Sequence, residues 1–339
     1  MALSAYARCS VILAFALALL TAPPAARAER VAGLYQAEVE LADSREQAFS
    51  DALAAVLVRI TGRRDVPERP EVAPLLENAR AYAQQFRQPA PGRLWVAFDG
   101  TALERELAEL GQPVWGPERP VTVLWIAIDG GGGKRFVMAS EPEAAAGAER
   151  APREALAQTA ARRGIPLVYP LMDAEDRATA SFAEVWGGFE DSILEASRRY
   201  GADAVLVGRL NADDPGHGRW TLLDNGTARR WTGSAPESID RLADLFAARF
   251  AVLSAGGARD VRVSVSGVET VEDYGQASRF LARLTAVETL SVESVQPDRV
   301  VFRARVRGTP AALDEAVRLG GLLAPDETGA AGLSYRVAR

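Results

Sequence analysis

The sequence is poor in the residues that most often build active sites and metal centres. Its 339 residues include one Cys and one His. Cys9 lies in a segment that we predict to be removed on export, which excludes disulfides, thiol catalysis and Cys-ligated zinc or iron–sulfur sites from the mature chain. His217 is the only histidine, so a Ser-His-Asp triad has one possible base and a multi-histidine site is impossible within one chain. We therefore predict no cofactor and no bound metal.

Basic residues are also in deficit. The chain has 39 Lys plus Arg against 45 Asp plus Glu, a net charge of −6, and removal of residues 1–28 takes away Arg8 and Arg27 and no acid. The mature chain is therefore still more acidic. Such a chain is a poor candidate for binding nucleic acid or anionic lipid by charge alone, so we predict no nucleic-acid partner.

Long apolar runs are missing after the first 28 residues. Within those residues Arg8 precedes an apolar run at 11–20, and the segment ends in Ala26-Arg27-Ala28, with small residues at both key positions of an A-x-A site. This pattern predicts a secretory signal peptide cleaved after Ala28. No later stretch approaches the roughly 18 apolar residues of a membrane-spanning helix. We therefore expect an exported periplasmic protein that does not span the membrane.

The patterns predict an α/β and α+β protein in three blocks, 29–118, 119–256 and 257–339. In the first block we expect a strand at 33–41, a helix beginning near Asp43, a second helix at 71–86, a strand at 94–98 and a helix at 101–110. The alternating strands and helices of the central block favour an α/β domain whose sheet is covered by helices, with a hairpin at Asp224-Asn225-Gly226. Whether the first two blocks share one sheet stays open.

The third block has a more specific pattern. From residue 260 the predicted order is strand, helix, two strands, helix and a final strand near 333–337. This βαββαβ order predicts a C-terminal ferredoxin-like domain, with an antiparallel sheet and both helices on one face. That fold hosts many unrelated functions, so it indicates no activity.

Two loops carry residues that enzymes use, but neither has the spacing that catalysis needs. Gly130-Gly-Gly-Gly-Lys134 follows a strand, yet Arg135 stands where a phosphate loop requires Ser or Thr. His217 lies close to Asp213 and Asp214 in a stretch with Pro and Gly that predicts a solvated turn. No catalytic residue is therefore predicted.

The strongest candidate for a binding contact is Trp186-Gly187-Gly188-Phe189. Two aromatic residues bracket a glycine pair at the start of a helix that we predict over 189–200. Glycine lets another backbone approach closely, and aromatic residues are enriched in interface hot spots. A hydrophobic contact at the helix entry, packed into the protein's own core, is the alternative. We keep these four residues as candidate partner contacts.

Several short segments together resemble the DUF2066 family of proteobacterial envelope proteins. The resemblance is carried by Gly33-Leu-Tyr-Gln36, Ala54-Ala-Val-Leu-Val-Arg-Ile-Thr-Gly62, Leu94-Trp-Val-Ala-Phe-Asp99, Pro113-Val-Trp-Gly116 and Tyr200-Gly-Ala-Asp203. It implies an envelope protein and supplies no catalytic residue. The central block, with Gly201-Ala-Asp203 before an apolar strand, also looks like the amino-terminal domain of TolB and like LpoB-type penicillin-binding-protein activators. That likeness implies a protein-binding role.

These observations favour a non-enzymatic periplasmic adaptor or assembly factor that binds an envelope protein. The alternative is a module that binds a small envelope ligand, such as a glycan or lipid fragment, in a groove between domains. A carboxylate-based hydrolase is the third hypothesis, because Asp and Glu are abundant whereas Cys and His are not.

Overall fold

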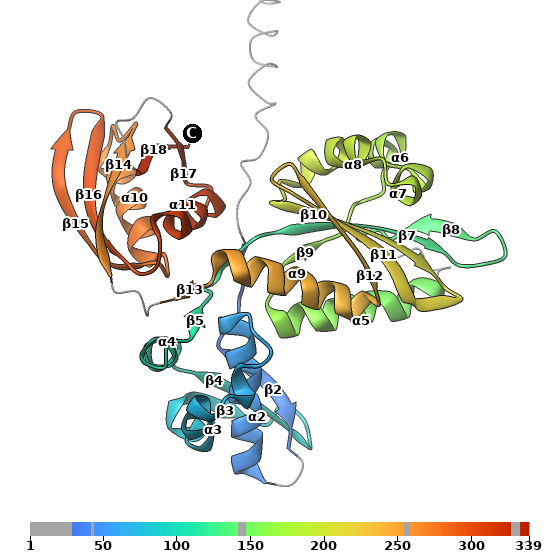
Figure 1. The fold of residues 1–339 in the computed structure, drawn as a ribbon, viewed down its shortest axis with the longest axis horizontal. Helices are drawn as coiled ribbons and strands as arrows, with labels where there is room; N and C mark the ends of the chain where they lie inside the picture. Colours follow the sequence, from blue (N-terminus) through green and yellow to red (C-terminus); the bar gives the residue numbers. More distant parts are fainter. Residues whose placement is uncertain (1–28, 42–43, 142–146, 254–257, 327–332, 339) are drawn as a thin grey trace, which may run out of the picture.

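The structure is a computed structural model that describes residues 29–41, 44–141, 147–253, 258–326 and 333–338. The three larger sheets lie apart, each with its own helices, and the C-terminal end of the long helix α9 (Ala235–Phe250) lies where the three parts meet (Figure 1). The predicted α/β and α+β class is confirmed, since parallel and antiparallel pairings both occur. The predicted signal peptide lies outside the described residues.

The N-terminal sheet is separate from the central one, which answers the question that the sequence left open. Its strands have the antiparallel order β2-β4-β3, with β2 (Gln36–Glu40), β4 (Arg93–Phe98) and β3 (Ala83–Arg87). Helix α2 (Arg45–Thr61) contributes Phe49, Leu53 and Ile60 to the core of this part. The helix begins because the Ser44 side chain accepts a hydrogen bond from the Gln47 amide at 3.0 Å.

The predicted helix over 71–86 is wrong. The segment forms η2 (Pro70–Val72), α3 (Ala73–Glu77) and η3 (Ala79–Tyr82) before it becomes strand β3. The Asn78 side-chain amide donates to the Pro74 carbonyl at 2.9 Å, a local bond that competes with continuation of the helix. Phe86 belongs to the apolar spacing that predicts a helix, but in the structure it packs from β3 against Phe49, with ring centroids 5.3 Å apart. Helix α4 (Gly100–Glu109) follows β4, capped by Asp99.

The central part is a six-stranded mixed sheet with helices on both faces. The strand order is β12-β11-β10-β7-β8, and β9 also pairs with β7. The strands are β7 (Thr122–Asp129), β8 (Arg135–Val137), β9 (Leu167–Val168), β10 (Ala204–Asn211), β11 (Asp214–Asp224) and β12 (Thr227–Gly233). The helices are α5 (Gly147–Arg163), α6 (Ala174–Thr179), α7 (Phe182–Gly187), α8 (Glu190–Ser197), η4 (Arg198–Tyr200) and α9 (Ala235–Phe250).

The two faces of the central sheet have different cores. Leu124 and Leu206 pack with residues of α5 and α9, whereas Val123, Trp125 and Val205 pack with residues of α7 and α8. Strand β7 is apolar from Val123 to Ile128 because it is buried on both faces, as central strands of α/β sheets are. The sequence patterns do not predict α6 and α7, and α7 carries half of the candidate site.

The C-terminal part has the predicted order of elements and one extra strand. Its elements are β14 (Arg259–Ser266), α10 (Val271–Arg283), β15 (Val287–Gln296), β16 (Arg299–Val306), α11 (Pro310–Leu319), β17 (Leu323–Pro325) and β18 (Leu333–Val337). The sheet order is β15-β16-β14-β18-β17. The expectation of a wholly antiparallel sheet is wrong at one edge, because β17 turns back and lets β18 pair with β14 in parallel.

The N-terminal and central parts meet where α2 ends. Gly62 ends the helix in the left-handed conformation, and the buried Trp115 packs on Phe246 and Phe250, each with ring centroids 6.4 Å away. The Arg163 side chain, 2% exposed, donates to the Gly62 carbonyl at 2.8 Å and pairs with two aspartates of α9. A cation at the C-terminal end of a helix satisfies carbonyl groups that have no partner within the helix.

An arginine of α9 joins the central and C-terminal parts. Arg249 donates to both carboxylate oxygens of Asp224 at 2.9 and 3.1 Å, and to both oxygens of Glu315 on α11 at 2.6 and 2.7 Å. Two short strand pairs tie together the segments that connect the three parts. They are β5 (Pro113–Val114) with β13 (Val252–Leu253), and β1 (Glu29–Arg30) with β6 (Glu118–Arg119).

Candidate functional site

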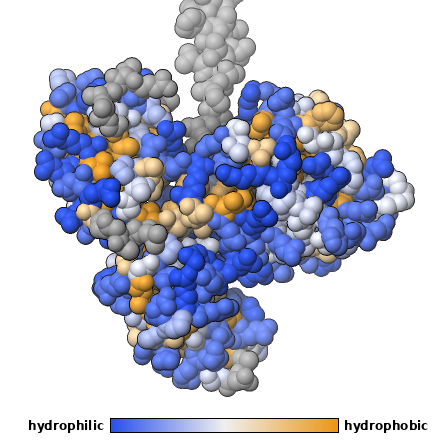
Figure 2. Space-filling view, viewed as in Figure 1, coloured by the Kyte–Doolittle hydropathy of each residue, from blue (hydrophilic) through white to orange (hydrophobic). Residues whose placement is uncertain are grey.

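The four predicted contact residues form the joint between α7 and α8, on one face of the central sheet. Trp186 is half-buried in the last turn of α7, and Phe189 precedes α8 with 61% of its surface exposed. An exposed aromatic side chain of this size is uncommon on a surface that is otherwise mostly hydrophilic (Figure 2). The joint therefore offers apolar area to another molecule, next to Leu194 of α8, which is 40% exposed.

The two glycines of the joint make room for groups of this chain. A Cβ atom on Gly187 would lie 2.5 Å from the Phe189 ring, so that ring rests directly against the glycine. Gly188 ends α7 with a φ of 74°, and a Cβ atom there would lie 3.2 Å from an Nη atom of Arg209. The glycine pair thus lets Phe189 fold back and lets the chain pass close to an arginine of β10.

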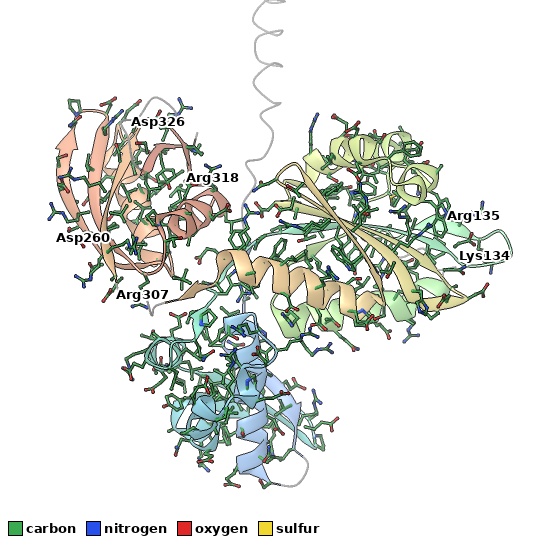
Figure 3. The ribbon with its side chains drawn as sticks, viewed as in Figure 1. Lys134, Arg135, Asp260, Arg307, Arg318 and Asp326 are labelled. Atoms are coloured by element: carbon green, nitrogen blue, oxygen red, sulfur yellow. The ribbon has the colours of Figure 1, made fainter. Side chains whose placement is uncertain are left out.

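Trp186 belongs to a stack of rings and guanidinium groups. Its ring stacks on Phe182 with centroids 5.4 Å apart and planes at 19°. Arg135 lies 6.0 Å from the Phe182 centroid, and Arg219 lies 5.7 Å from the Trp186 centroid. Figure 3 shows Arg135 and Lys134 at the far end of the β7–β8 hairpin. Cation–π contacts on both sides hold the aromatic pair in a defined orientation.

A cavity of about 350 Å³ opens between this joint and the central sheet. Its walls come from α7, α8, β10, β11 and β12, which are far apart in the sequence. The lining residues are Gly187, Gly188, Glu190, Ile193, Val207, Arg209, Thr221 and Arg230.

Arg209 is the most poorly satisfied charged group in the wall of this cavity. Its Nη1 atom lies 3.4 Å from the Trp186 carbonyl and its Nη2 atom lies 3.4 Å from the Thr221 hydroxyl, both at the long limit for a hydrogen bond. Its Nε atom is buried and has no hydrogen-bond partner in the described part of the chain. Burial first, and then the charges of Arg219 and Arg230, lower the pKa of the Arg209 guanidinium.

The remaining charges at the cavity are an ion pair. Arg230 of β12 pairs with Glu190, the first residue of α8. This pair ties the N-terminal end of α8 to the sheet and leaves the cavity with more positive than negative charge.

A second cavity, of about 540 Å³, lies on the other side of α8, against the turn of the β11–β12 hairpin. Its lining is acidic and includes Glu190, Asp191, Asp203 and Asp224. Burial raises the pKa of Asp203 to about 6. A hydrogen bond from the Val121 amide, at 2.8 Å, opposes this shift, and the Asp224 charge adds to it. Helix α8 therefore separates a basic cavity from an acidic one.

The other residues that the sequence singled out lie apart from this site. His217 is exposed in strand β11, where a turn was expected, and its Nδ1 atom lies 2.7 Å from Asp214. Residues 130–134 form the turn between β7 and β8. Among the described residues, no group of three or more His, Cys, Asp or Glu is placed to hold a metal ion. A search of the same residues finds no helix of sufficient length and hydropathy to span a bilayer.

Sequence reasoning missed Arg209, Thr221 and Arg230. Each lies on a strand where alternation alone predicts a solvent-facing or core position, and 20 to 44 residues separate them from the α7–α8 joint. A signal was present in the charge of Arg209, which follows the apolar run Val205–Gly208 without a break. A charged residue in a buried central strand indicates either a buried ion pair or a functional site.

Comparison with protein families gives a match over the N-terminal part of the chain. A family model described as a domain of unknown function, DUF8605, matches residues 28–116. The resemblance to DUF2066 is therefore wrong, and the likeness of the central block to TolB and LpoB-type domains finds no support and is dropped with it. The candidate site lies outside the matched residues.

Comparisons with individual proteins add no functional information. No curated protein matches the chain. The chain is similar to a crystal structure of prolyl-tRNA synthetase from Cryptosporidium parvum complexed with halofuginone and AMPPNP, at 10% identity, over 64% of this chain and 48% of that one. The chain thus spans about half the length of that structure, and the TM-score of 0.20 is too low to support an argument.

Proposed function

We propose that this protein is a non-enzymatic adaptor or assembly factor of the periplasm, which binds an envelope protein at the α7–α8 joint. The observation that supports this most directly is the 61% exposure of Phe189 beside a Trp186 that is held by Phe182 and Arg219. Aromatic side chains held in place lose little conformational freedom on binding, and such residues dominate interface energies.

The polar groups around the joint favour binding over catalysis. Arg209, Arg219 and Arg230 carry guanidinium groups, which have donors and no acceptor, so they orient and neutralise a ligand. Thr221 is placed to donate or accept one hydrogen bond. Glu190 is the carboxylate that lines the cavity, and it is engaged by Arg230.

The periplasmic location rests on the sequence of residues 1–28. Arg8, the apolar run after it and the Ala26-Arg27-Ala28 site follow one another in the order of a cleaved export signal. Fractionation of cells that produce the full chain, with mass measurement of the product, tests this part. We expect a periplasmic chain that begins at Glu29.

A second candidate function is supported by the space between the N-terminal and central parts. A cavity of about 590 Å³ lies there, lined by Trp95, Arg59 and residues of α5 and of the loop that follows it. Arg87 lies 4.7 Å from the centroid of the Trp95 ring. A half-buried tryptophan beside polar groups suits a small envelope ligand such as a glycan fragment. Stabilisation of the purified chain by glycans, lost in Trp95→Ala, would favour this function over the adaptor.

Site-specific photo-crosslinking in the native cells tests the adaptor function. A benzophenone amino acid replaces Phe189 in one variant and Val271, which is 87% exposed on α10, in a matched control. We expect one dominant protein to be captured from position 189 and not from position 271. The Trp186→Ala variant, shown by circular dichroism to be folded, should lose this product.

Two outcomes would contradict the proposal. Identical products from positions 189 and 271 would mean that capture reflects exposure alone. An exported, folded chain that captures nothing from position 189 would move the binding surface elsewhere.

A further inference from the structure

The cavity beneath the α7–α8 joint contains an arginine whose hydrogen-bonding capacity is largely unused. A guanidinium group has five N–H donors. Arg209 uses two of its nitrogen atoms at 3.4 Å, and its buried Nε atom has no partner within the described residues. A buried polar group left unsatisfied costs stability, so it calls for an explanation such as a ligand that is bound during function.

The buried arginines at the domain junctions are different. Arg119 donates to three carbonyl contacts at 2.7 to 2.8 Å, and Arg163 donates to a carbonyl at 2.8 Å and pairs with two carboxylates. These two residues have short bonds that account for their burial, although each also has one nitrogen atom without a partner among the described residues. Arg209 has two long bonds instead, and it lines a cavity.

The local charge favours an anion. The charges of Arg219 and Arg230 both act on Arg209, and Glu190 is the carboxylate that opposes them. The chain as a whole carries a net charge of −6, so the excess of positive charge is a local feature. Because a cavity wall excludes part of the solvent, this field is screened less than it would be on an open surface.

The start of α8 adds to this field. Phe189 occupies the N-cap position, and no side chain accepts a hydrogen bond from the first amides of the helix. Glu190 and Ile193 of this first turn line the cavity. The positive end of the helix dipole is therefore directed to the same space as the arginines.

We propose that this cavity binds a carboxylate of the partner protein, from an acidic side chain, through Arg209 and Arg230. The planar fork of a guanidinium matches the two oxygens of a carboxylate. The adjoining Phe189, 61% exposed, gives the apolar residue next to that carboxylate a surface to pack on. A phosphate group would satisfy the same donors, and the choice of a carboxylate rests on the proposed function.

Nuclear magnetic resonance of the arginine Nε–Hε groups in the purified chain, residues 29–339, tests this inference. The probes are the acetylated, amidated tetrapeptide Gly-Glu-Phe-Gly, the same peptide with Gln in place of Glu, and inorganic phosphate. Loss of a signal in Arg209→Gln identifies the Arg209 resonance. We expect the Glu peptide to shift this resonance to saturation. The Gln peptide should have an affinity at least about tenfold lower, because a charge-assisted bond is lost.

Neighbouring residues on β12 provide a matched control. Both residues are exposed, but Arg230 lines the cavity whereas Arg229 points to the opposite face of the sheet, since side chains alternate along a strand. Arg230→Gln and Arg229→Gln remove the same charge. We expect Arg230→Gln to weaken binding of the Glu peptide about tenfold or more and Arg229→Gln to leave it within about twofold.

Three results would overturn the inference. Equal binding of the Glu and Gln peptides would exclude carboxylate recognition, and equal weakening by the two arginine variants would mean that net charge alone attracts the peptide. Phosphate binding tighter than the Glu peptide would replace the carboxylate by a phosphate ligand. The titration needs no native partner, so its failure together with successful crosslinking at position 189 would remove the carboxylate site and leave the adaptor function standing.

Discussion

Replacing Gly62 by alanine tests how the N-terminal part is joined to the central part. Gly62 ends α2 with a φ of 70°, and a Cβ atom added there would lie 2.3 Å from the Cβ atom of Ala247 on α9 and 3.0 Å from the Trp115 ring. The Ala247 Cβ atom is attached directly to a helix backbone and cannot rotate away. The substitution must therefore strain the left-handed conformation and also separate α2 from α9.

The free energy of unfolding that Gly62→Ala loses has two parts that can be separated. The left-handed conformation costs a non-glycine residue roughly 1–2 kcal/mol, and overpacking of a tight contact costs typically about 1–3 kcal/mol more. Gly92→Ala provides the control, because Gly92 has a φ of 73° and nothing within 4 Å of the added Cβ atom. We expect Gly92→Ala to incur only the cost of the left-handed conformation, and Gly62→Ala to incur the cost of overpacking as well.

Urea unfolding, followed by circular dichroism and tryptophan fluorescence, measures the difference. The free energy of unfolding should fall by roughly 1–2 kcal/mol in Gly92→Ala and by roughly 2–5 kcal/mol in Gly62→Ala. The fluorescence change should be larger in Gly62→Ala, since Trp115 lies in the contact. If the two variants lose the same free energy, α2 and α9 are not in the close contact described above.

Three further substitutions test charged groups. Asp203→Asn should raise the free energy of unfolding at pH 7 by up to about 3 kcal/mol. The folded pKa of about 6 lies above the ordinary 3.8, so the native chain loses stability as the pH rises through 6 and this carboxylate ionises. Unfolding between pH 4 and 8 should show a flatter profile in the variant. Arg163→Met should lower the free energy of unfolding by roughly 3 kcal/mol, because the Gly62 carbonyl loses its donor and two aspartates of α9 lose an ion-pair partner. Urea unfolding measures this loss. Arg249→Leu should cost roughly 2–3 kcal/mol, and in a double-mutant cycle with Glu315→Gln the two changes should not add.

Much of the fold could be predicted because its signals are local. The apolar spacing of residues 49–60 forms the buried face of α2, and the Asp-Asn-Gly sequence at 224–226 forms the β11–β12 turn. Both depend on residues within a few positions of one another. The predicted helix over 71–86 failed for the opposite reason, since Phe86 is held in β3 by pairing with β4 and by contact with Phe49, about 40 residues away.

The candidate site could be predicted only in part, for a similar reason. An aromatic pair around two glycines is visible in the sequence, and it led to Trp186 and Phe189. The basic cavity is invisible there, because it exists only where α7 and α8 cross β10, β11 and β12. The glycines were interpreted as room for a partner, and in the structure that room is taken by Phe189 and Arg209 of the same chain.

This internal use of the glycines explains why the aromatic joint and the basic cavity belong to one surface. With a side chain at position 188, the Arg209 guanidinium would have to shift by a few tenths of an ångström, and the strained left-handed conformation would disrupt the end of α7. The same residue therefore fixes the orientation of Trp186 and the distance between the α7–α8 joint and the arginine. Gly188→Ala should accordingly weaken both capture from position 189 and binding of the Glu peptide. Loss of one without the other would show that the two halves of the surface act independently.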